Sequence, residues 1–422
     1  MTERTFDIIV YGATGFTGKR VVSHLLSKHP ELKIAVSGRN LEKLTSLATS
    51  LNVPQSNVIK ASESNELVHA FSQAKIVLAC AGPYRHVGEP IVKAAIEAKT
   101  DYLDLCGEPQ FFDDMLAKYD SLAQKNGVIV MSACAFDCVP AELTLQLAKR
   151  TLEQQGKHMT NVEIVHTAEN ITCGNPTTFH AAVDGFHAAQ KGELKASREK
   201  VKSVLHLDPV VKPPSHWPKI VSSPGIMPVF HPETNTHLIK FMGADAACIL
   251  ASDRYLRYRN PQCREIAHPR MSVCLGIPNK KSAYKVLAYG GIFSTLARTK
   301  FGCNLLKNNP SLFSNGFFRE GGPTEEELEK GTFKTFCTAW GESEKDRVQV
   351  TCEGGEPGYV ATPAMISALA LGVIHHRDKI AFDSGVMLPG AAFGTCHEIY
   401  DLLKAEGIVF RILQQENTDN VV

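Results

Sequence analysis

An apolar run followed by three evenly spaced glycines constrains this chain more than any other feature. Residues 8–10, Ile-Ile-Val, have the pattern of a buried strand. Gly12, Gly15 and Gly18 follow at once, and a helical pattern then runs over residues 19–28. A strand, a glycine turn and a helix in this order open a dinucleotide-binding βαβ unit. The glycines allow a tight turn, a close approach of the backbone to a pyrophosphate, and close packing of helix on strand.

The glycine spacing is GxxGxxG rather than the commoner GxGxxG, so a glycine-rich turn in an unrelated α/β protein is the alternative interpretation. The strand before the turn and the helix after it favour the nucleotide site. The helix start offers unpaired N–H groups and a positive dipole end to phosphates. The residues predicted to contact the coenzyme here are Gly12, Thr14, Gly15, Phe16 and Gly18.

The end of the second predicted strand, residues 32–37, indicates which coenzyme is bound. NAD-binding proteins usually carry an acidic residue at this strand end, where it holds the ribose 2′-hydroxyl. Here the sequence is Ser37-Gly-Arg39, without an acidic residue. Arg39 stands where a guanidinium accepts a 2′-phosphate, and Ser37 is a further donor. These residues predict NADP(H), the alternative being that Arg39 is a solvated loop residue.

Length, charge and cysteine usage exclude several classes of protein. A chain of 422 residues is too long for one ordinary core, which favours two domains. The net charge of +1, without a basic stripe, argues against a nucleic-acid partner. The N-terminus does not resemble a signal or transit peptide, and no apolar run reaches the ~20 residues of a membrane span. The 12 cysteines form no CxxC pair or zinc-type cluster, so we expect reduced thiols, a cytoplasmic location and no metal.

The first 140 residues alternate strand and helix patterns, which is typical of parallel strands joined by crossovers. The fold class expected is α/β, with a Rossmann-type doubly wound parallel sheet. The helix between the fourth and fifth strands is expected at residues 89–98, with Pro90 in its first turn. The strands expected after residue 37 are residues 58–60, 74–81, 101–105 and 128–132.

After about residue 150 the pattern changes to that of an α+β domain. Residues 161–168, 333–339 and 347–352 alternate as half-buried antiparallel strands do. Residues 385–390 read as a turn-rich connection and residues 409–413 as a last strand. We expect this second domain to cover a substrate site.

Residues 283–313 are more apolar than their neighbours but too short and too interrupted to span a bilayer. Two interpretations remain open for this segment. It can lie on a lipid surface, such as a membrane or a lipid droplet, or form a subunit contact in a homodimer. Alternatively, it is an ordinary buried helix pair.

Six further motifs, together with the glycine turn, resemble the saccharopine dehydrogenase-like oxidoreductases over nearly the whole chain. The resemblance implies a Rossmann domain over residues 1–150, completed by residues 356–422, with an α+β substrate and dimerisation domain at residues 151–355. It also implies a nicotinamide coenzyme. One departure is Ala135-Phe-Asp-Cys138, where the family usually has Gly-Phe-Asp-Ser. The motifs are Gly38-Arg39, Ala81-Gly-Pro-Tyr-Arg85 with Gly88-Glu-Pro90, Asp104-Leu-Cys-Gly-Glu-Pro-Gln-Phe111, Phe136-Asp-Cys-Val-Pro-Ala-Glu-Leu143, Phe241-Met-Gly-Ala-Asp245 and Gly358-Tyr-Val-Ala-Thr-Pro363.

Three loops after predicted strands carry the candidate catalytic groups. The carboxyl ends of parallel strands meet at one edge of a sheet, beside the coenzyme. Gly82 and Pro83 can form a wall of the coenzyme site, and Tyr84 can donate a proton to the substrate. Glu108 and Asp137 can exchange a proton if burial raises their pKa. The alternatives are that Tyr84 only braces its loop and that the two carboxylates cap helices.

These observations predict an NADP(H)-dependent oxidoreductase that reduces a C=N, C=O or C=C acceptor. The family includes amino-acid imine reductases of the saccharopine type and enoyl reductases that act on lipid intermediates. Among these acceptors, the apolar segment at residues 283–313 favours a lipid-like small-molecule substrate. Two alternatives stay open: a saccharopine-type imine reductase, and an NADP(H)-binding redox sensor or lipid-surface scaffold without activity.

Overall fold

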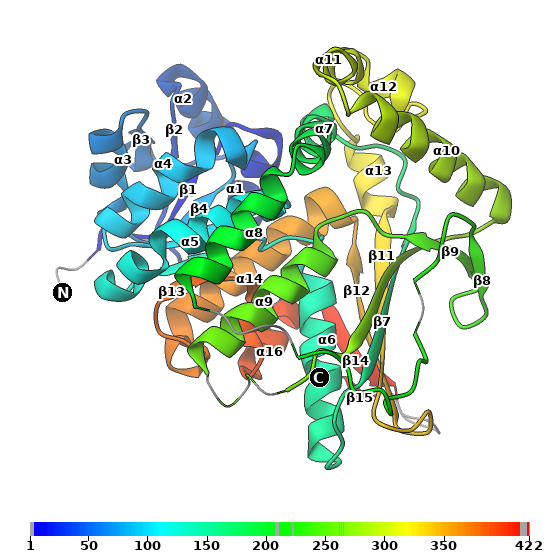
Figure 1. The fold of residues 1–422 in the computed structure, drawn as a ribbon. Coiled ribbons are helices and arrows are strands. Elements are labelled where there is room, and N and C mark those ends of the chain that lie inside the picture. The colour runs from blue at the N-terminus through cyan, green and yellow to red at the C-terminus, as the bar shows by residue number, and fades with distance from the viewer. Residues whose placement is uncertain are drawn as a thin grey trace. The chain divides into compact units, whose positions relative to one another are not determined.

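The structure is a computed structural model that describes residues 4–413, apart from residues 207–210, 222, 261, 263 and 265, together with residues 420–421. The chain divides into two compact units, each built from two stretches of sequence (Figure 1). The first unit takes residues 1–139 and 358–407, and the second takes residues 140–357 and 408–422. The expected boundaries at residues 150 and 356 therefore move, because α6 (Val139–Gln154) and the chain after residue 407 belong to the second unit.

The first unit is built on a parallel sheet of seven strands in the order β13-β6-β5-β4-β1-β2-β3. The strand order reverses between the neighbours β1 and β4, which makes this the switch point of a doubly wound sheet. The expected fold class is confirmed. The strands are β1 (Phe6–Tyr11), β2 (Ile34–Gly38), β3 (Val58–Lys60), β4 (Ala74–Ala79), β5 (Asp101–Asp104), β6 (Ile129–Met131) and β13 (Gly385–Met387).

Burial on both faces explains the apolar runs of this sheet. Ile8, Ile9 and Val10 are completely buried, and Ile8 pairs in register with Ile34 on one side and Ile76 on the other. Parallel sheets are covered by helices on both faces, so their strands contain few polar residues. The helices of this unit are α1 (Phe16–Lys28), α2 (Leu41–Ser50), α3 (Ser64–Phe71), α4 (Tyr84–Glu97), α5 (Pro109–Asn126), α14 (Thr362–His375), α15 (Pro389–Phe393) and α16 (Glu398–Ala405).

Helix α4 begins earlier than expected. It starts at Tyr84, directly after Pro83 at the N-cap, and Pro90 lies in its interior rather than in its first turn. Proline lacks the N–H that would bond four residues back, so it commonly marks a helix start. The sequence prediction followed that signal, and it missed the first turn because a side chain from another loop caps it.

The C-terminal part of this unit corrects a second expectation. Residues 385–390 form β13 and the start of α15 rather than an irregular connection. Val386 is held by a 2.8 Å hydrogen bond from its N–H to the carboxylate of Asp120, and β13 pairs in parallel with β6. The sequence prediction missed this strand because it has only three residues and is followed by Pro389 and Gly390, which are typical of turns.

Helix α14 is the apolar helix of the first unit. Within the described residues, its extended form, Pro357–His375, is the one helix long and apolar enough to cross a membrane, and 78% of its most apolar stretch is buried in the protein. It packs on α1, α16, β4 and β5. Its composition is explained by this core position.

The second unit contains a mixed sheet of eight strands in the order β15-β14-β12-β11-β7-β10-β9-β8. Strand β7, near the middle of this sheet, pairs antiparallel with β11, as expected, but parallel with β10. The strands are β7 (Asn161–Glu169), β8 (Val229–His231), β9 (Thr236–Lys240), β10 (Arg270–Ile277), β11 (Thr332–Trp340), β12 (Arg347–Gly355), β14 (Val409–Leu413) and β15 (Asn420–Val421).

Strand β14 is found at the expected residues but in a different sheet. It pairs antiparallel with β12 of the mixed sheet, so the last stretch of the chain does not complete the Rossmann domain. Only one of its five residues is fully buried, a pattern suited to a sheet with one exposed face and not to a parallel sheet covered on both faces.

The helices of the second unit include a mostly exposed group at residues 280–313. In α10 only Ala283 is buried, whereas Cys303 and Leu306 of α11 lie in a core cluster with α7. The interpretation of this segment as an ordinary buried helix pair is therefore wrong for α10 and confirmed only for one face of α11. The helices are α6 (Val139–Gln154), α7 (Pro176–Gln190), α8 (Glu193–Val204), α9 (Asp245–Arg259), α10 (Lys280–Leu296), α11 (Lys300–Asn308), α12 (Pro310–Phe313) and α13 (Glu325–Lys330).

Candidate functional site

The glycine turn between β1 and α1 has no room for side chains at two of its three positions. Gly12 has a left-handed backbone, with φ +80°, and a Cβ there would lie 2.8 Å from the N atom of Ala81. A Cβ on Gly18 would lie 2.2 Å from the carbonyl oxygen of Gly12. Gly15 is exposed and is the N-cap of α1, without a side-chain cap. The first turn of α1 therefore has no side-chain cap at Gly15, which fits a pyrophosphate bound at the helix start.

The predicted neighbours Thr14 and Phe16 border this turn. Thr14 is exposed, and Phe16 is half-buried because its ring packs edge-on against Tyr359, with the ring centres 4.8 Å apart. The guanidinium of Arg20 lies over the Phe16 ring at 5.1 Å. The C-terminal segment that precedes α14 therefore contacts the predicted coenzyme loop, which the sequence prediction did not anticipate.

At the end of β2, Ser37 is buried whereas Arg39 is exposed. Ser37 is fully buried, and its hydroxyl donates to the carbonyl oxygen of Ile59 at 2.8 Å. Its own carbonyl accepts from the N–H of Gly12 at 2.9 Å, so Ser37 anchors the turn. Arg39 is exposed and close enough to Tyr11 for its charge to oppose the rise in the pKa of Tyr11 caused by burial. Of the two predicted phosphate donors, Arg39 is the one with free access to a 2′-phosphate.

The loop after β4 presents backbone rather than side chains. Gly82 is exposed and Pro83 is half-buried. The hydroxyl of Tyr84, in contrast, is inside the protein, where it donates to the carbonyl oxygen of Ala79 at 2.7 Å and accepts from the N–H of Leu105 at 3.1 Å. Burial raises the pKa of Tyr84 well above its ordinary value. These contacts are those of a brace between β4 and the loop after β5, as in the alternative interpretation.

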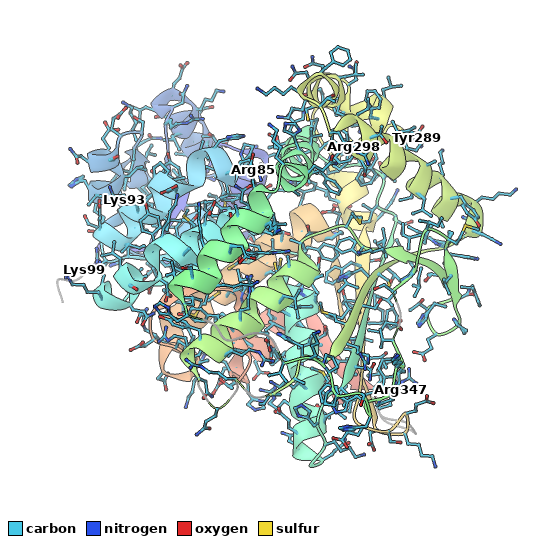
Figure 2. The ribbon with its side chains drawn as sticks, viewed as in Figure 1. Arg85, Lys93, Lys99, Tyr289, Arg298 and Arg347 are labelled. Carbon is cyan, nitrogen blue, oxygen red and sulfur yellow. The ribbon has the colours of Figure 1, made fainter. Side chains whose placement is uncertain are left out.

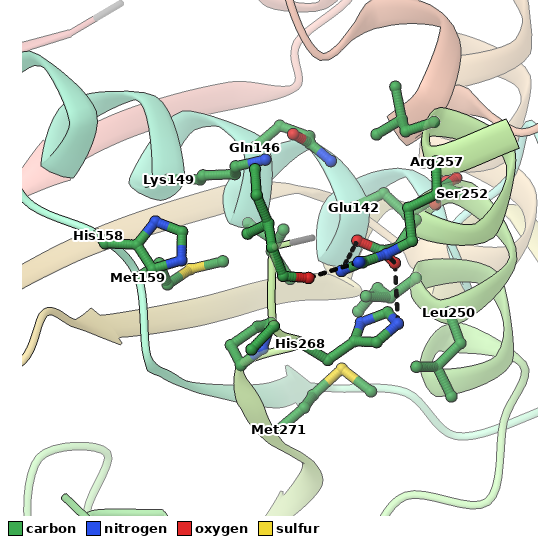
Figure 3. Close-up of a pocket in the computed structure, with 17 residues that line it drawn as sticks. Glu142, Gln146, Lys149, His158, Met159, Leu250, Ser252, Arg257, His268 and Met271 are labelled. Carbon is green, nitrogen blue, oxygen red and sulfur yellow. Dashed lines mark hydrogen bonds and ion pairs between the residues drawn. The ribbon is translucent and has the colours of Figure 1, made fainter. Parts of the chain in front are cut away.

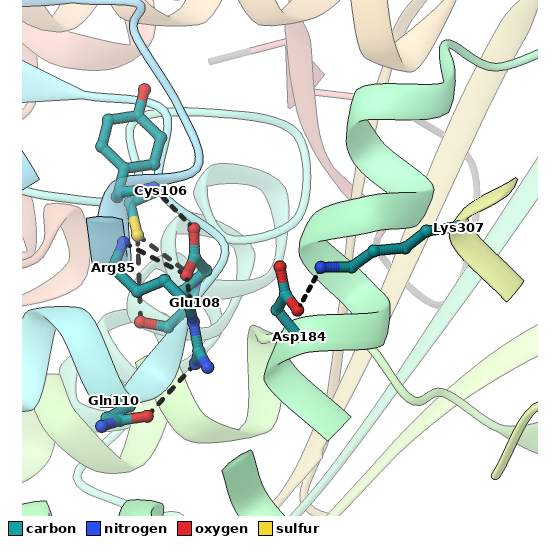
Figure 4. Close-up of polar contacts among 7 residues, drawn as sticks. Arg85, Cys106, Glu108, Gln110, Asp184 and Lys307 are labelled. Atoms are coloured by element: carbon teal, nitrogen blue, oxygen red, sulfur yellow. Dashed lines mark hydrogen bonds and ion pairs between the residues drawn. The ribbon is translucent and has the colours of Figure 1, made fainter. Parts of the chain in front are cut away.

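Glu108 precedes α5 but caps a different helix. Its carboxylate accepts from the N–H of Tyr84 at 2.8 Å and pairs with the Nε of Arg85 at 2.9 Å (Figure 4). Arg85 also donates to the side chain of Gln110 at 3.2 Å. Only 6% of Glu108 is exposed. The carboxylate thus stabilises the N-terminus of α4, where a negative charge is favourable, and a proton-transfer role would require these contacts to loosen.

Asp137 lies beside the loop that carries Glu108. It is half-buried, and a Cβ on Gly107 would lie 3.5 Å from its carboxylate oxygen. The neighbouring N–H of Phe136 donates to the hydroxyl of Thr362 at 3.2 Å, which ties this loop to the start of α14. Asp137 is therefore the most accessible of the three predicted catalytic side chains.

Asp104, at the end of β5, is a residue that the sequence prediction missed. Its carboxylate is completely buried and accepts four hydrogen bonds. Burial raises its pKa to about 6, although the hydrogen bonds oppose the rise. An aspartate directly after Tyr102 and Leu103, at the end of β5, was the available signal, because buried acids are rare unless they are paired.

The second unit has its own polar clusters. Asp184 pairs with Lys307 (Figure 4), and buried His166 lies 3.2 Å from the carboxylate of Asp245. A separate pocket lies between α6, α9 and residues 266–271, where Asp253 pairs with Arg257 and with His268 (Figure 3). Among the described residues, no cluster of three or more potential ligands is arranged to hold a metal ion.

Comparisons with known proteins agree with this arrangement. Residues 8–131 match a family model described as the saccharopine dehydrogenase NADP binding domain. A saccharopine dehydrogenase-like oxidoreductase of Mus musculus is 32% identical and covers 97% of this chain and 98% of its own length. A lipid droplet localized protein of Caenorhabditis elegans is 28% identical, with 96% and 98% covered.

A solved structure of a saccharopine dehydrogenase shares the fold. Saccharopine dehydrogenase (L-Glu forming) from Saccharomyces cerevisiae superposes with a TM-score of 0.55 at 13% identity, covering 97% of this chain and all of that one. At this identity the match concerns the fold alone. The two-unit architecture with its glycine turn, and the identity over nearly the full length of the mouse relative, lead to one conclusion. The chain belongs to the saccharopine dehydrogenase-like oxidoreductase family, and its residues 8–131 match the NADP binding domain of saccharopine dehydrogenase.

Proposed function

We propose that this protein is an NADP(H)-dependent oxidoreductase that transfers a hydride to a C=N, C=O or C=C acceptor. The observation that carries the proposal is the turn of Gly12, Gly15 and Gly18, where the backbone leaves no room for a Cβ at Gly12 or Gly18 and exposes the start of α1. Such a cradle, with no side-chain cap on the first turn of α1, suits a pyrophosphate.

Arg39 favours NADP(H) over NAD(H). It is exposed at the end of β2, where no acidic side chain is present to hold a ribose 2′-hydroxyl. A guanidinium at this place can pair with a 2′-phosphate through two N–H groups. The NADP-binding family model that matches residues 8–131 supports the same choice.

The nicotinamide coenzyme supplies the hydride, so the protein must hold the acceptor and move a proton. Asp137 is our candidate for the proton transfer because it is half-buried beside the loops after β5 and β6. Glu108 is the second candidate, in a position that it can leave only by releasing Arg85 and the N–H of Tyr84. Tyr84 braces the same loop from within.

The test begins with binding. NADPH and NADH are titrated into the protein, and we expect NADPH to bind at least ten times more tightly, the ratio that one good charged contact provides. Panels of aldehydes, imines and enoyl thioesters, each with short and long alkyl chains, are then screened for loss of NADPH absorbance. Turnover of a long-chain member would identify a lipid-like acceptor, and turnover of a keto-acid imine would favour the saccharopine-type alternative.

The same experiment separates the enzyme from a sensor. If NADPH binds and no acceptor in the panels is reduced, the non-catalytic NADP(H)-binding protein becomes the better proposal. If neither nucleotide binds, both proposals fail together.

The exposed apolar side chains of α10–α12 favour a second role at a lipid surface. Ile292 is 49% exposed, Phe301 is 77% exposed and Leu312 is 68% exposed. Arg298 lies in the connection between α10 and α11 (Figure 2), and Lys300 begins α11, so both add positive charge beside these side chains. Exposed apolar patches with a basic border suit an anionic lipid surface. The name of the worm relative, a lipid droplet localized protein, points the same way.

Binding to lipid vesicles or artificial droplets tests this second role. A homodimer formed through α10–α12 is the competing outcome, and it would appear as a protein of twice the mass in light scattering without lipid. We propose a cytoplasmic protein that is attached peripherally to lipid in the first outcome and not in the second.

A further inference from the structure

The carboxylate of Asp104, at the carboxyl edge of the parallel sheet, accepts four hydrogen bonds. One oxygen accepts from the backbone N–H groups of Cys106, at 2.9 Å, and Ala133, at 3.0 Å. The other accepts from the hydroxyls of Tyr102 and Ser132, both at 2.9 Å. The side chain is completely buried. A buried carboxylate loses its favourable hydration, and these four hydrogen bonds compensate part of that free-energy cost. An apolar residue at this position would have no such cost.

Three of the four donors come from two loops, and the fourth, the hydroxyl of Tyr102, lies on β5 itself. Cys106 follows β5 and precedes Glu108, whereas Ser132 and Ala133 follow β6 and precede Asp137. A backbone bond of 2.8 Å from the N–H of Cys134 to the carbonyl of Asp104 adds a further tie. Asp104 therefore fastens together the loops that hold both candidate proton-transfer residues.

Ala133, one of the donors to Asp104, has an unfavourable backbone conformation. Ala133 has φ +63°, in the left-handed region that residues with a Cβ rarely adopt. Such a conformation persists where surrounding contacts enforce it, and the bond from its N–H to Asp104 is one of these contacts. The loops also touch, since a Cβ on Gly107 would lie 3.5 Å from the carboxylate of Asp137.

The strand order places these loops on one half of the coenzyme site. The sheet reverses between β1 and β4, with β2 and β3 on one side and β5, β6 and β13 on the other. In doubly wound sheets the adenosine half lies over the first group and the nicotinamide half over the second. The loops fastened by Asp104 belong to the nicotinamide half.

We propose that Asp104 is a positioning residue, which through its hydrogen bonds holds the loops of Glu108 and Asp137 in place to receive the nicotinamide half of the coenzyme. This inference rests on the proposed NADP(H) site. Asp104 itself is buried beneath these loops and acts through them. We therefore expect its loss to weaken the binding of NADPH but not the binding of a ligand that has only the adenosine half.

The experiment compares the binding of NADPH with that of 2′,5′-ADP, which has the adenosine half and the 2′-phosphate but no nicotinamide. Asp104→Ala removes all four acceptor contacts, and we expect NADPH affinity to fall about tenfold while 2′,5′-ADP affinity changes less than about twofold. Asp104→Asn keeps one carbonyl for the two backbone donors, and its amide can donate to the two hydroxyls. We therefore expect the asparagine variant to bind both ligands like the wild type.

Asp101 provides a matched control on the same strand. It lies at the opposite end of β5, where it accepts from the N–H of Ile129 at 2.8 Å and pairs with Arg377. Asp101→Ala removes a partly buried carboxylate from the same unit, and we expect it to change neither affinity.

A second variant covers the case that Asp104→Ala does not fold. Ser132→Ala removes one of the four donors, and we expect NADPH affinity to fall about threefold relative to 2′,5′-ADP. The inference is overturned if the ratio of the two affinities stays unchanged in a folded Asp104→Ala or in Ser132→Ala, or if both ligands weaken equally. Failure of the wild type to bind either ligand would instead overturn the proposed function.

Discussion

The carboxylate of Glu108 accepts a hydrogen bond from the N–H of Tyr84 at 2.8 Å, so the residue before one helix caps the start of another. The same carboxylate pairs with Arg85, and both side chains are largely buried. A single side chain thus connects the loops after β4 and β5. This relationship explains why α4 begins at Tyr84, although its sequence carries no N-cap side chain.

Replacing Glu108 should therefore destabilise the first unit. We expect Glu108→Ala to lower the free energy of unfolding by about 3 kcal/mol, because it leaves Arg85 without its buried partner and the N–H of Tyr84 unsatisfied. Glu108→Gln keeps an acceptor for Tyr84 and should cost about 1 kcal/mol. Urea denaturation measures both values. Equal stability of the alanine variant and the wild type would contradict the capping role.

Arg39 should decide between the two coenzymes. We expect Arg39→Ala to weaken NADPH binding by about 10- to 100-fold, the range for losing a charged hydrogen-bonded contact, and to leave NADH binding unchanged. Isothermal titration with each nucleotide provides the measurement. Lys99, an exposed cation on the same unit (Figure 2), serves as the control, and Lys99→Ala should alter neither affinity.

The glycine turn should tolerate substitution only where a Cβ has space. Gly18→Ala places a Cβ 2.2 Å from the carbonyl oxygen of Gly12, so we expect loss of NADPH binding and a destabilisation of about 2 kcal/mol or more. Gly38→Ala is the matched control, because its Cβ would meet Leu44 at an ordinary 3.8 Å. Thermal unfolding and nucleotide titration follow both variants. A Gly18→Ala protein that still binds NADPH normally would argue against the predicted cradle.

Asp104 should make the stability of the protein depend on pH in an unusual direction. Its pKa is raised from 3.8 to about 6 in the folded protein, so the folded state binds the proton more tightly than the unfolded state does. The stability that this proton contributes is complete below about pH 4 and is lost as the pH rises through about 6. The loss amounts to roughly 3 kcal/mol.

Asp104→Asn should remove this loss. Denaturation of the wild type and the variant between about pH 4 and pH 7 isolates the contribution of Asp104, because the other groups titrate in both proteins. Tyr102, Tyr84 and Cys80 face the carboxylate, and burial raises the pKa of each, so they stay neutral over this range. Parallel stability curves for the two proteins would show that Asp104 does not titrate there.

The lipid-surface proposal predicts a loss of binding without a loss of fold. The double variant Ile292→Glu and Phe301→Glu should float with anionic vesicles severalfold less than the wild type, because charged side chains are costly at an apolar interface. Leu41 is 50% exposed on the first unit, and Leu41→Glu is the control that should float like the wild type. Unchanged flotation of the double variant would remove α10–α12 from the proposal.

The nucleotide-binding half of the fold could be predicted from local patterns. Ile8, Ile9 and Val10, the glycines that follow them and the alternation of strands with helices required a parallel sheet with a glycine turn at its edge, because few other arrangements bury such runs. Arg39 could be identified for the same reason, since its position depends only on the end of β2.

Long-range contacts decided the rest. The roles of Tyr84 and Glu108 depend on hydrogen bonds between loops more than 20 residues apart, which no local pattern encodes. The pairing of β14 with β12 and the short strand β13 likewise depend on partners distant in sequence. The sequence by itself predicted the kind of site and its coenzyme class. The tertiary structure decided which side chains are accessible there, because burial and hydrogen bonding assign Tyr84, Glu108 and Asp104 to holding the loops and leave Arg39 and Asp137 accessible.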